Sequence, residues 1–283
     1  MTKDFNLKHE NNLTPSVEVV EAYRKVVMRD DFEESLALVH YRGGEEEFRL
    51  GEFYAASEDP INRAVGADIL GQLGWQERTY LQESLNILIP MLDDSDDFVI
   101  YCACCAIGHR SDEEAISHLI RLAEHENSQI RYGVTTSLSG LETEEAIDTL
   151  ITLTKDSDRD VRNWAMFGLG TQTEADTALV REALIVGVSD NDSEIRGEAL
   201  VGLAVRKDCR VIELILNEWN SFDDISILSL EAAEEISSPR LYSKLVEYSE
   251  TLECVGDVPF EFQLQSALDA CQPKIEQVNP VDR

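Results

Sequence analysis

The cysteines at positions 102–105 come closest to a chemical motif in this chain of 283 residues. Cys102 and Cys105 lie three residues apart, so a helix would place both thiols on one face, and His109 follows one turn later. A structural zinc site commonly uses two such pairs of ligands, and the sequence has no second Cys or His pair with matching spacing. We therefore expect these small side chains to pack a helix, and we predict neither a metal nor a cofactor.

Other catalytic signatures are missing or incomplete. The segment GLGTQT, which begins at Gly168, starts like a dinucleotide-binding loop but lacks the third glycine and the preceding strand. No HExxH, P-loop or GxSxG motif occurs, and the five histidines have no spacing that indicates catalysis. We therefore predict that the protein is not an enzyme. The glycines of the GLGTQT segment are expected to allow helices of adjacent repeats to pack closely.

The helices that must carry any functional residue belong to an internal repeat. Five segments align, each with a polar turn, an apolar residue, usually an arginine, and then small apolar residues; the aligned positions are Arg63, Ile100, Arg131, Arg162 and Arg196. The intervals are 37, 31, 31 and 34 residues, and a weaker copy has Ser226 at this position. Stretches such as EEAIDTLITLTKD lie between the copies and have the apolar period of an amphipathic helix. Each repeat is therefore predicted to be two helices joined by a short turn.

A single helix pair cannot bury both of its faces, so successive pairs must stack. We predict an all-α fold, a right-handed α-solenoid of about six to seven stacked helix pairs with capping helices. One elongated domain is expected, with a flexible N-terminus (1–15), N-terminal helices and the first repeat helix (16–57), repeats (58–236), C-terminal capping helices (237–272) and a flexible tail (273–283).

The most regular copies are DRDVRNWAMFGLGTQ, residues 158–172, and DSEIRGEALVGLAVRKD, residues 192–208. They closely resemble bacterial HEAT-repeat proteins, including those described as phycobilisome-lyase-like HEAT repeats, and the resemblance covers roughly residues 45–236. The resemblance implies a solenoid that holds a protein partner in its curved face. It also implies an alternative, an enzyme subunit such as a bilin lyase, because a fold does not decide a function.

The repeat register predicts which side chains face a partner. Counted from the aligned arginine, positions −1, +3, +4 and +7 hold the apolar consensus, so positions +1, +2 and +5 of each second helix point the other way. The predicted partner-binding residues at these positions are Asp68, Tyr101, Tyr132, Asn163, Trp164, Phe167 and Glu198. Aromatic residues on a rigid surface anchor many protein interfaces. The alternative is that these aromatic side chains pack between repeats.

The polar residues of the repeat have structural explanations as well. Asp and Ser residues before each second helix are predicted N-caps. The arginines recur one repeat apart near turn acids such as Asp59, Asp158 and Asp192, which predicts Arg–Asp contacts between neighbouring repeats. The acidic runs Glu45–Glu47 and Asp93–Asp97 are typical of solvated turns, and they could equally form the rim of a binding surface.

The charge of the chain restricts its partners. Asp and Glu number 56 against 24 Lys and Arg, a formal net charge of −32, which disfavours nucleic acid and anionic membranes and favours a basic protein. An immunity or inhibitor protein of a toxin, an adaptor and a chaperone all fit this description. A further alternative is acidity that serves only salt adaptation or solubility. No secretory signal or membrane-spanning run is recognisable, and we expect a cytoplasmic protein with reduced thiols.

Overall fold

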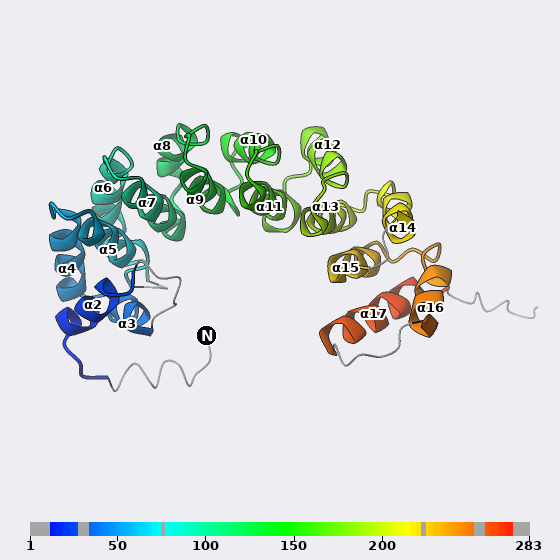
Figure 1. Ribbon diagram of the computed structural model, residues 1–283, viewed down its shortest axis with the longest axis horizontal. Helices are drawn as coiled ribbons and strands as arrows, with labels where there is room; N and C mark the ends of the chain where they lie inside the picture. Colours follow the sequence, from blue (N-terminus) through cyan, green and yellow to red (C-terminus); the bar gives the residue numbers. More distant parts are fainter. Residues whose placement is uncertain (1–11, 28–33, 75–76, 222–224, 252–257, 274–283) are drawn as a thin grey trace, which may run out of the picture. The chain divides into compact units, whose positions relative to one another are not determined.

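The structure is a computed structural model that describes residues 12–27, 34–74, 77–221, 225–251 and 258–273 (Figure 1). The predicted flexible ends, 1–15 and 273–283, lie mostly outside these residues. The described residues form helices and no strand, which confirms the all-α prediction. The α-helices are α2 (Ser16–Arg24), α3 (Glu34–Arg42), α4 (Glu45–Ala55), α5 (Pro60–Gly71), α6 (Leu81–Met91), α7 (Asp97–Arg110), α8 (Ile116–Ile120), α9 (Ser128–Leu138), α10 (Glu144–Leu153), α11 (Arg159–Phe167), α12 (Ala178–Gly187), α13 (Ser193–Val205), α14 (Val211–Ser221), α15 (Ile227–Ile236), α16 (Tyr242–Thr251) and α17 (Val258–Cys271).

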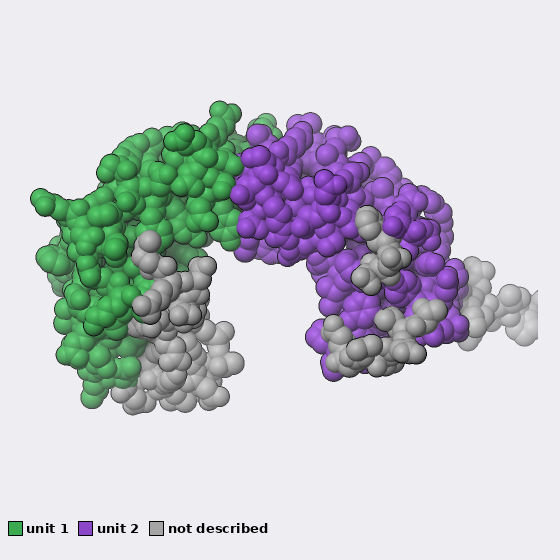
Figure 2. Space-filling model, viewed as in Figure 1, with its two compact units in different colours: residues 1–149 green, residues 150–283 purple. Residues whose placement is uncertain are grey.

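The chain divides into two compact units, residues 1–149 (unit 1) and residues 150–283 (unit 2), which have different colours in Figure 2. In unit 1, α4 packs on α5, α6 on α7 and α8 on α9, and the second helices α5, α7 and α9 also pack on one another in that order. In unit 2, α12, α14 and α16 pair with α13, α15 and α17, and α11, α13, α15 and α17 pack in sequence. Stacked helix pairs of this kind make an α-solenoid, as the repeat predicted.

The second helices from α5 to α15 each begin with a polar side chain that caps the helix. At α5, the Asp59 carboxylate accepts a hydrogen bond from the backbone N–H of Ile61 at 3.0 Å. The corresponding caps of α7, α9, α11, α13 and α15 are Asp96, Asn127, Asp158, Asp192 and Ser226. Each cap satisfies a backbone N–H that the first helical turn leaves without a partner. The predicted role of these turn residues is thus confirmed.

Three of the repeated arginines, Arg63, Arg162 and Arg196, contact an acid of the following repeat. Arg63 Nε and Nη2 donate to the two carboxylate oxygens of Asp94 at 2.7 and 2.8 Å. Its Nη1 donates to the carbonyls of Ser57 and Glu58, at 3.2 and 2.9 Å, in the turn before its own helix. The acid therefore comes from the following repeat, two residues before that repeat's cap. At Arg63 the predicted Arg–Asp contact between repeats is thus made by Asp94, whereas the capping residue Asp59 contacts Arg24.

The same arrangement recurs in unit 2. Arg162 Nε donates to Asp190 at 2.9 Å, and the backbone N–H of Asp192 donates to the same carboxylate, also at 2.9 Å. Arg196 takes its acid from α14, where Glu218 accepts at 2.9 and 3.1 Å. Of these three ion pairs, only Arg196–Glu218 is almost fully buried: the side chains of Arg196 and Glu218 are 8% and 9% exposed.

Close helix packing in unit 1 depends on Gly66. A Cβ atom at Gly66 would lie 2.3 Å from the backbone nitrogen of Ala55, at the contact between α4 and α5. We expect Gly66→Ala to destabilise the fold by about 3 kcal/mol, because two backbones must separate. Gly44→Ala is the control, because the one atom close to a Cβ there is a carboxylate oxygen of Glu47 at 3.0 Å and no backbone atom is in the way. Chemical denaturation should show a loss below about 1 kcal/mol for that variant; equal losses would contradict this explanation.

Candidate functional site

The predicted tyrosines of unit 1 lie together on neighbouring second helices. Tyr101 of α7 and Tyr132 of α9 are both half-buried, and their ring centroids are 6.5 Å apart with a tilt of 36°. Phe98 extends the row on α7, 6.3 Å from Tyr101. Burial, reinforced by the neighbouring Cys105 thiol, raises the pKa of the Tyr101 hydroxyl. Phe98, Tyr101 and Tyr132 thus form a row of partly exposed aromatic rings in which each ring contacts the next.

Asp68 has a different environment from the one that the register predicted. The Tyr23 hydroxyl of α2 donates to the Asp68 carboxylate at 2.7 Å, so an N-terminal helix covers this position. Burial raises the pKa of Asp68 to about 7, although hydrogen bonds from Tyr23 and Cys102 oppose the shift. The physical reason is that α2 lies outside the repeat and packs against α5, which the repeat register cannot reveal.

In unit 2, α11 exposes an aromatic pair. Trp164 is 36% exposed, and its ring meets Phe167 edge-to-face, with centroids 5.4 Å apart at 87°. The preceding residue, Asn163, is only 9% exposed, and its Oδ1 atom is buried without a hydrogen-bond partner. Position +1 of this repeat is therefore turned towards the protein interior, whereas position +2 faces outward. Trp164 and Phe167 are the better placed of the three for contact with a partner.

Carboxylates are crowded on the next second helices of unit 2. Burial, and then the like charges of Glu231 and Glu194, raise the pKa of Glu198 on α13 to about 7. Glu231 on α15 is shifted in the same direction by burial and by Glu234 and Glu235. No lysine or arginine within the described ranges pairs with Glu198 or Glu231. We call Trp164, Phe167, Glu198 and Glu231 the acidic–aromatic face. Glu231 was not predicted, yet it stands at position +5 of the weak repeat copy that begins around Ser226.

The raised pKa of Glu198 predicts a pH-dependent stability. Between its ordinary value of 4.5 and its folded value near 7, the unfolded chain releases this proton first, so the free energy of unfolding falls as pH rises. Glu198→Gln should therefore be more stable than the wild type at pH 8, by about 1 kcal/mol after allowance for partial exposure. At pH 4 the two should unfold at the same temperature in calorimetry. If Glu198→Gln were no more stable than the wild type at pH 8, the ionised Glu198 side chain would not destabilise the folded chain.

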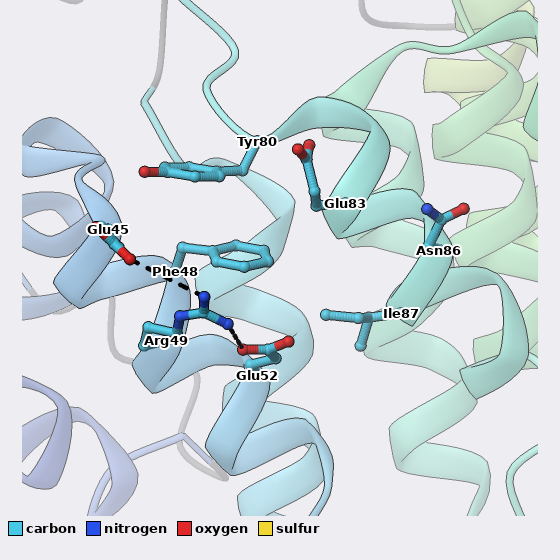
Figure 3. A pocket seen from close by; sticks show the side chains of 8 residues that line it. All are labelled: Glu45, Phe48, Arg49, Glu52, Tyr80, Glu83, Asn86 and Ile87. Atoms are coloured by element: carbon cyan, nitrogen blue, oxygen red, sulfur yellow. Dashed lines mark hydrogen bonds and ion pairs between the residues drawn. The ribbon is translucent and has the colours of Figure 1, made fainter.

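A second acidic site lies in unit 1 (Figure 3). A pocket of about 410 Å³ lies between α4 and α6 and is lined by Glu45, Phe48, Arg49, Glu52, Tyr80, Glu83, Asn86 and Ile87. The rings of Phe48 and Tyr80 stack at 4.6 Å and 13°. Arg49 contacts Glu52 at 2.7 Å and Glu45 at 3.9 Å. The pocket thus holds three carboxylates, of which two contact its one guanidinium, beside an aromatic wall, which suits an additional cationic side chain.

The remaining sequence motifs have structural roles. Cys102 and Cys104 are buried and Cys105 is partly buried, and burial raises the pKa of all three thiols. In the GLGTQT segment, a Cβ at Gly170 would lie 3.0 Å from the carbonyl oxygen of Glu198, so this glycine permits close helix packing. Over the ranges that the structure describes, no group of three or more His, Cys, Asp and Glu side chains could hold a metal ion. Nor is any described helix long and apolar enough to span a membrane.

Comparisons with known proteins agree with this architecture. Residues 49–139 and 85–170 match the family model of HEAT repeats. Protein YibA of Escherichia coli strain K12 is 29% identical over 218 residues, which cover 73% of this chain and 75% of YibA. A crystal structure of E. coli YibA has a TM-score of 0.68 at 24% identity and covers 96% of this chain and 97% of its own. An engineered protein has a TM-score of 0.50 at 15% identity, with coverages of 89% and 78%. The chain therefore has the α-solenoid fold, and it is similar to HEAT-repeat proteins over residues 49–170.

Proposed function

We propose that this chain is a non-enzymatic scaffold that holds a basic protein partner against its acidic–aromatic face. The observation that carries the proposal is the crowding of Glu198 and Glu231 without a basic neighbour, on helices that follow the exposed Trp164 in the stack. Crowded carboxylates raise the free energy of the unbound protein, and a cation supplied by a partner would relieve this repulsion.

The residue types of the face also suit this partner. An arginine that approaches Trp164 could stack its guanidinium on the indole and donate hydrogen bonds to Glu198. Binding a cation stabilises the ionised carboxylate, so it should return the pKa of Glu198 towards its ordinary value and release a proton. The pocket beside Phe48 and Tyr80 is a second, separate place in unit 1 where acidic side chains could contact a basic partner.

Titration of the chain with a peptide of alternating lysine and arginine tests this charge preference. At low salt we expect saturable binding in calorimetry, with proton release at pH 6–7, and no binding of a glutamate-rich peptide of equal length. Raising the ionic strength to about 1 M, where the Debye length is about 3 Å, should weaken the binding strongly.

Matched variants locate the site. The double change Glu198→Gln and Glu231→Gln should weaken peptide binding about tenfold or more, whereas Glu250→Gln, an exposed residue on α16, should have little effect. An affinity that falls equally in every Glu→Gln variant would indicate only the general field of the protein. An affinity that survives 1 M salt unchanged would contradict attraction by charge.

An immunity or inhibitor protein that neutralises a basic toxin or nuclease is one concrete form of this function. An adaptor or chaperone that holds an active partner is the other. The two differ in their effect on the partner, once it is identified: an inhibitor reduces the partner's activity at a one-to-one ratio, and an adaptor leaves it intact. An activity assay of the purified pair therefore decides between them.

A further inference from the structure

A small cavity in unit 1 shares no lining residue with the pocket described above. Its volume is about 180 Å³, and it is lined by Gly71, Gln72, Arg78, His109 and Arg110. The cavity has room for several water molecules, since one occupies about 30 Å³ in the liquid. Two arginines in one small cavity are unexpected, because like charges repel and because burial of a charge is costly without a counter-charge.

Arg110 is anchored by neutral groups alone. Its side chain is among the largest that are fully buried, with 1% exposed. Nη1 donates to the carbonyl of Leu73 at 2.8 Å, and Nη2 donates at 2.8 Å to the carbonyl of Thr79 and to the Ser84 hydroxyl. Of the two N–H groups that remain, the one on Nε is buried and has no partner. The guanidinium is thus fixed in place with its charge uncompensated.

Arg78 adds two more unsatisfied donors. Its Nε and Nη2 atoms are buried and have no hydrogen-bond partner. Burial, and then the positive charge of Arg78, lower the pKa of Arg110 to about 10. Burial also lowers the pKa of His109, so the imidazole is neutral near pH 7 and can donate one hydrogen bond. Among the residues that the structure describes, no carboxylate pairs with either guanidinium.

An equivalent arginine in unit 2 shows that the unpaired donors are not a requirement of the fold. Arg206 stands at the end of α13, as Arg110 stands at the end of α7, and its Nη2 donates to the carbonyl of Leu169, 37 residues earlier. Arg110 reaches the carbonyl of Leu73, also 37 residues earlier. In Arg206, however, Nε donates too, to the carbonyl of Ala175 at 2.9 Å. Only in unit 1 is this N–H left for the cavity.

We propose that this cavity binds a tetrahedral oxyanion, either inorganic phosphate or the phosphoryl group of a small molecule. The three unpaired nitrogen atoms, Nε and Nη2 of Arg78 and Nε of Arg110, would donate to its oxygens, and His109 would supply a further donor at the wall. Guanidinium groups match the geometry of phosphate oxygens, and two of them balance the charge of about −1.5 to −2 that a phosphate group carries at pH 7. In a chain with a net charge of −32, such a site must exclude carboxylates locally to attract an anion at all.

Equilibrium dialysis of the full-length chain with labelled inorganic phosphate at pH 7 tests the proposal. We expect saturable binding of one phosphate per chain, with sulfate as a competitor and chloride at equal ionic strength as a non-competitor. At about 100 times the dissociation constant, phosphate should raise the melting temperature by about 5 °C. Competition by glycerol phosphate at lower concentration than inorganic phosphate would identify a phosphoryl group as the ligand, and the reverse order would identify the free ion.

Arg78→Gln is the decisive variant, because Arg78 is only partly buried and the chain should still fold. It should lose phosphate binding and the thermal shift, while Arg49→Gln, on the surface of the same unit, should keep both. Arg110→Met should lose binding as well, with its fold checked by circular dichroism. A phosphate effect that persists in Arg78→Gln would be the general stabilisation that phosphate salts give, and it would overturn the proposal, as would absence of saturable binding in the wild type.

Discussion

Alanine at both Trp164 and Phe167 should weaken binding of the basic partner by about 30-fold or more. Aromatic side chains that become desolvated at an interface contribute about 1 kcal/mol or more each when truncated, so losing this edge-to-face pair should cost about 2 kcal/mol or more in total. Trp164 is 36% exposed and Phe167 is half-buried, so each truncation should lower the free energy of unfolding by less than the about 3–5 kcal/mol of a fully buried aromatic residue. Calorimetric titration with the partner, or with the lysine–arginine peptide, measures the loss.

Leu179→Ala is the matched control for this prediction. Leu179 is 64% exposed on α12, which belongs to the first-helix layer of unit 2. The substitution removes exposed apolar surface and leaves the acidic–aromatic face unchanged, so the affinity for the partner should stay within about twofold of the wild type. If Leu179→Ala weakened binding as much as the double variant, the partner would not be bound by the face that we define. Tyr132→Ala tests the aromatic row of unit 1 separately.

The second large effect concerns stability. Glu218→Leu should destabilise unit 2 by about 3 kcal/mol, because it leaves the Arg196 guanidinium buried without its acid. Arg196 and Glu218 are 8% and 9% exposed, and their contact at 2.9 Å joins α13 to α14. The double variant Arg196→Met and Glu218→Leu should recover most of the loss, since two apolar side chains of similar size replace a pair whose burial was itself costly. Urea denaturation of the wild type and of these two variants provides the comparison.

An exposed pair in the same unit is the control. Glu213 and Arg240 are both 59% exposed, so Glu213→Leu should cost less than about 1 kcal/mol. Were the double variant at Arg196 and Glu218 as unstable as Glu218→Leu alone, the loss would come from packing at position 218. The buried ion pair would then not be the cause.

The sequence predicted the fold in detail because the repeat makes each position recur. The register identified the helix pairs, the caps such as Asp158 and the arginines that join repeats, and all of these depend on contacts that every repeat shares. It predicted Arg–Asp contacts between repeats without naming the pairs, since Asp59 and Asp94 are both turn acids and only the stacking of two repeats shows that Arg63 binds Asp94.

The candidate site was less predictable, because it depends on departures from the repeat. Asp68 is covered by α2, a helix outside the register, and Asn163 is buried although it shares its register position with half-exposed tyrosines. The cavity of Arg78 and Arg110 joins residues about 30 positions apart, one of them in a connection between helices. No period or motif marks such a pair, and only the packed structure brings it together.

Photo-crosslinking from single positions tests the central claim most directly. A photoreactive amino acid placed at position 164 or 231 of the chain, in its native cell, should form adducts with one basic protein, of isoelectric point above about 9. The same amino acid at position 179 should not. These adducts should also disappear when the double change Trp164→Ala and Phe167→Ala accompanies the probe at position 231. Equal labelling from position 179, or adducts formed mainly with acidic proteins, would contradict a scaffold that binds a basic partner through its acidic–aromatic face.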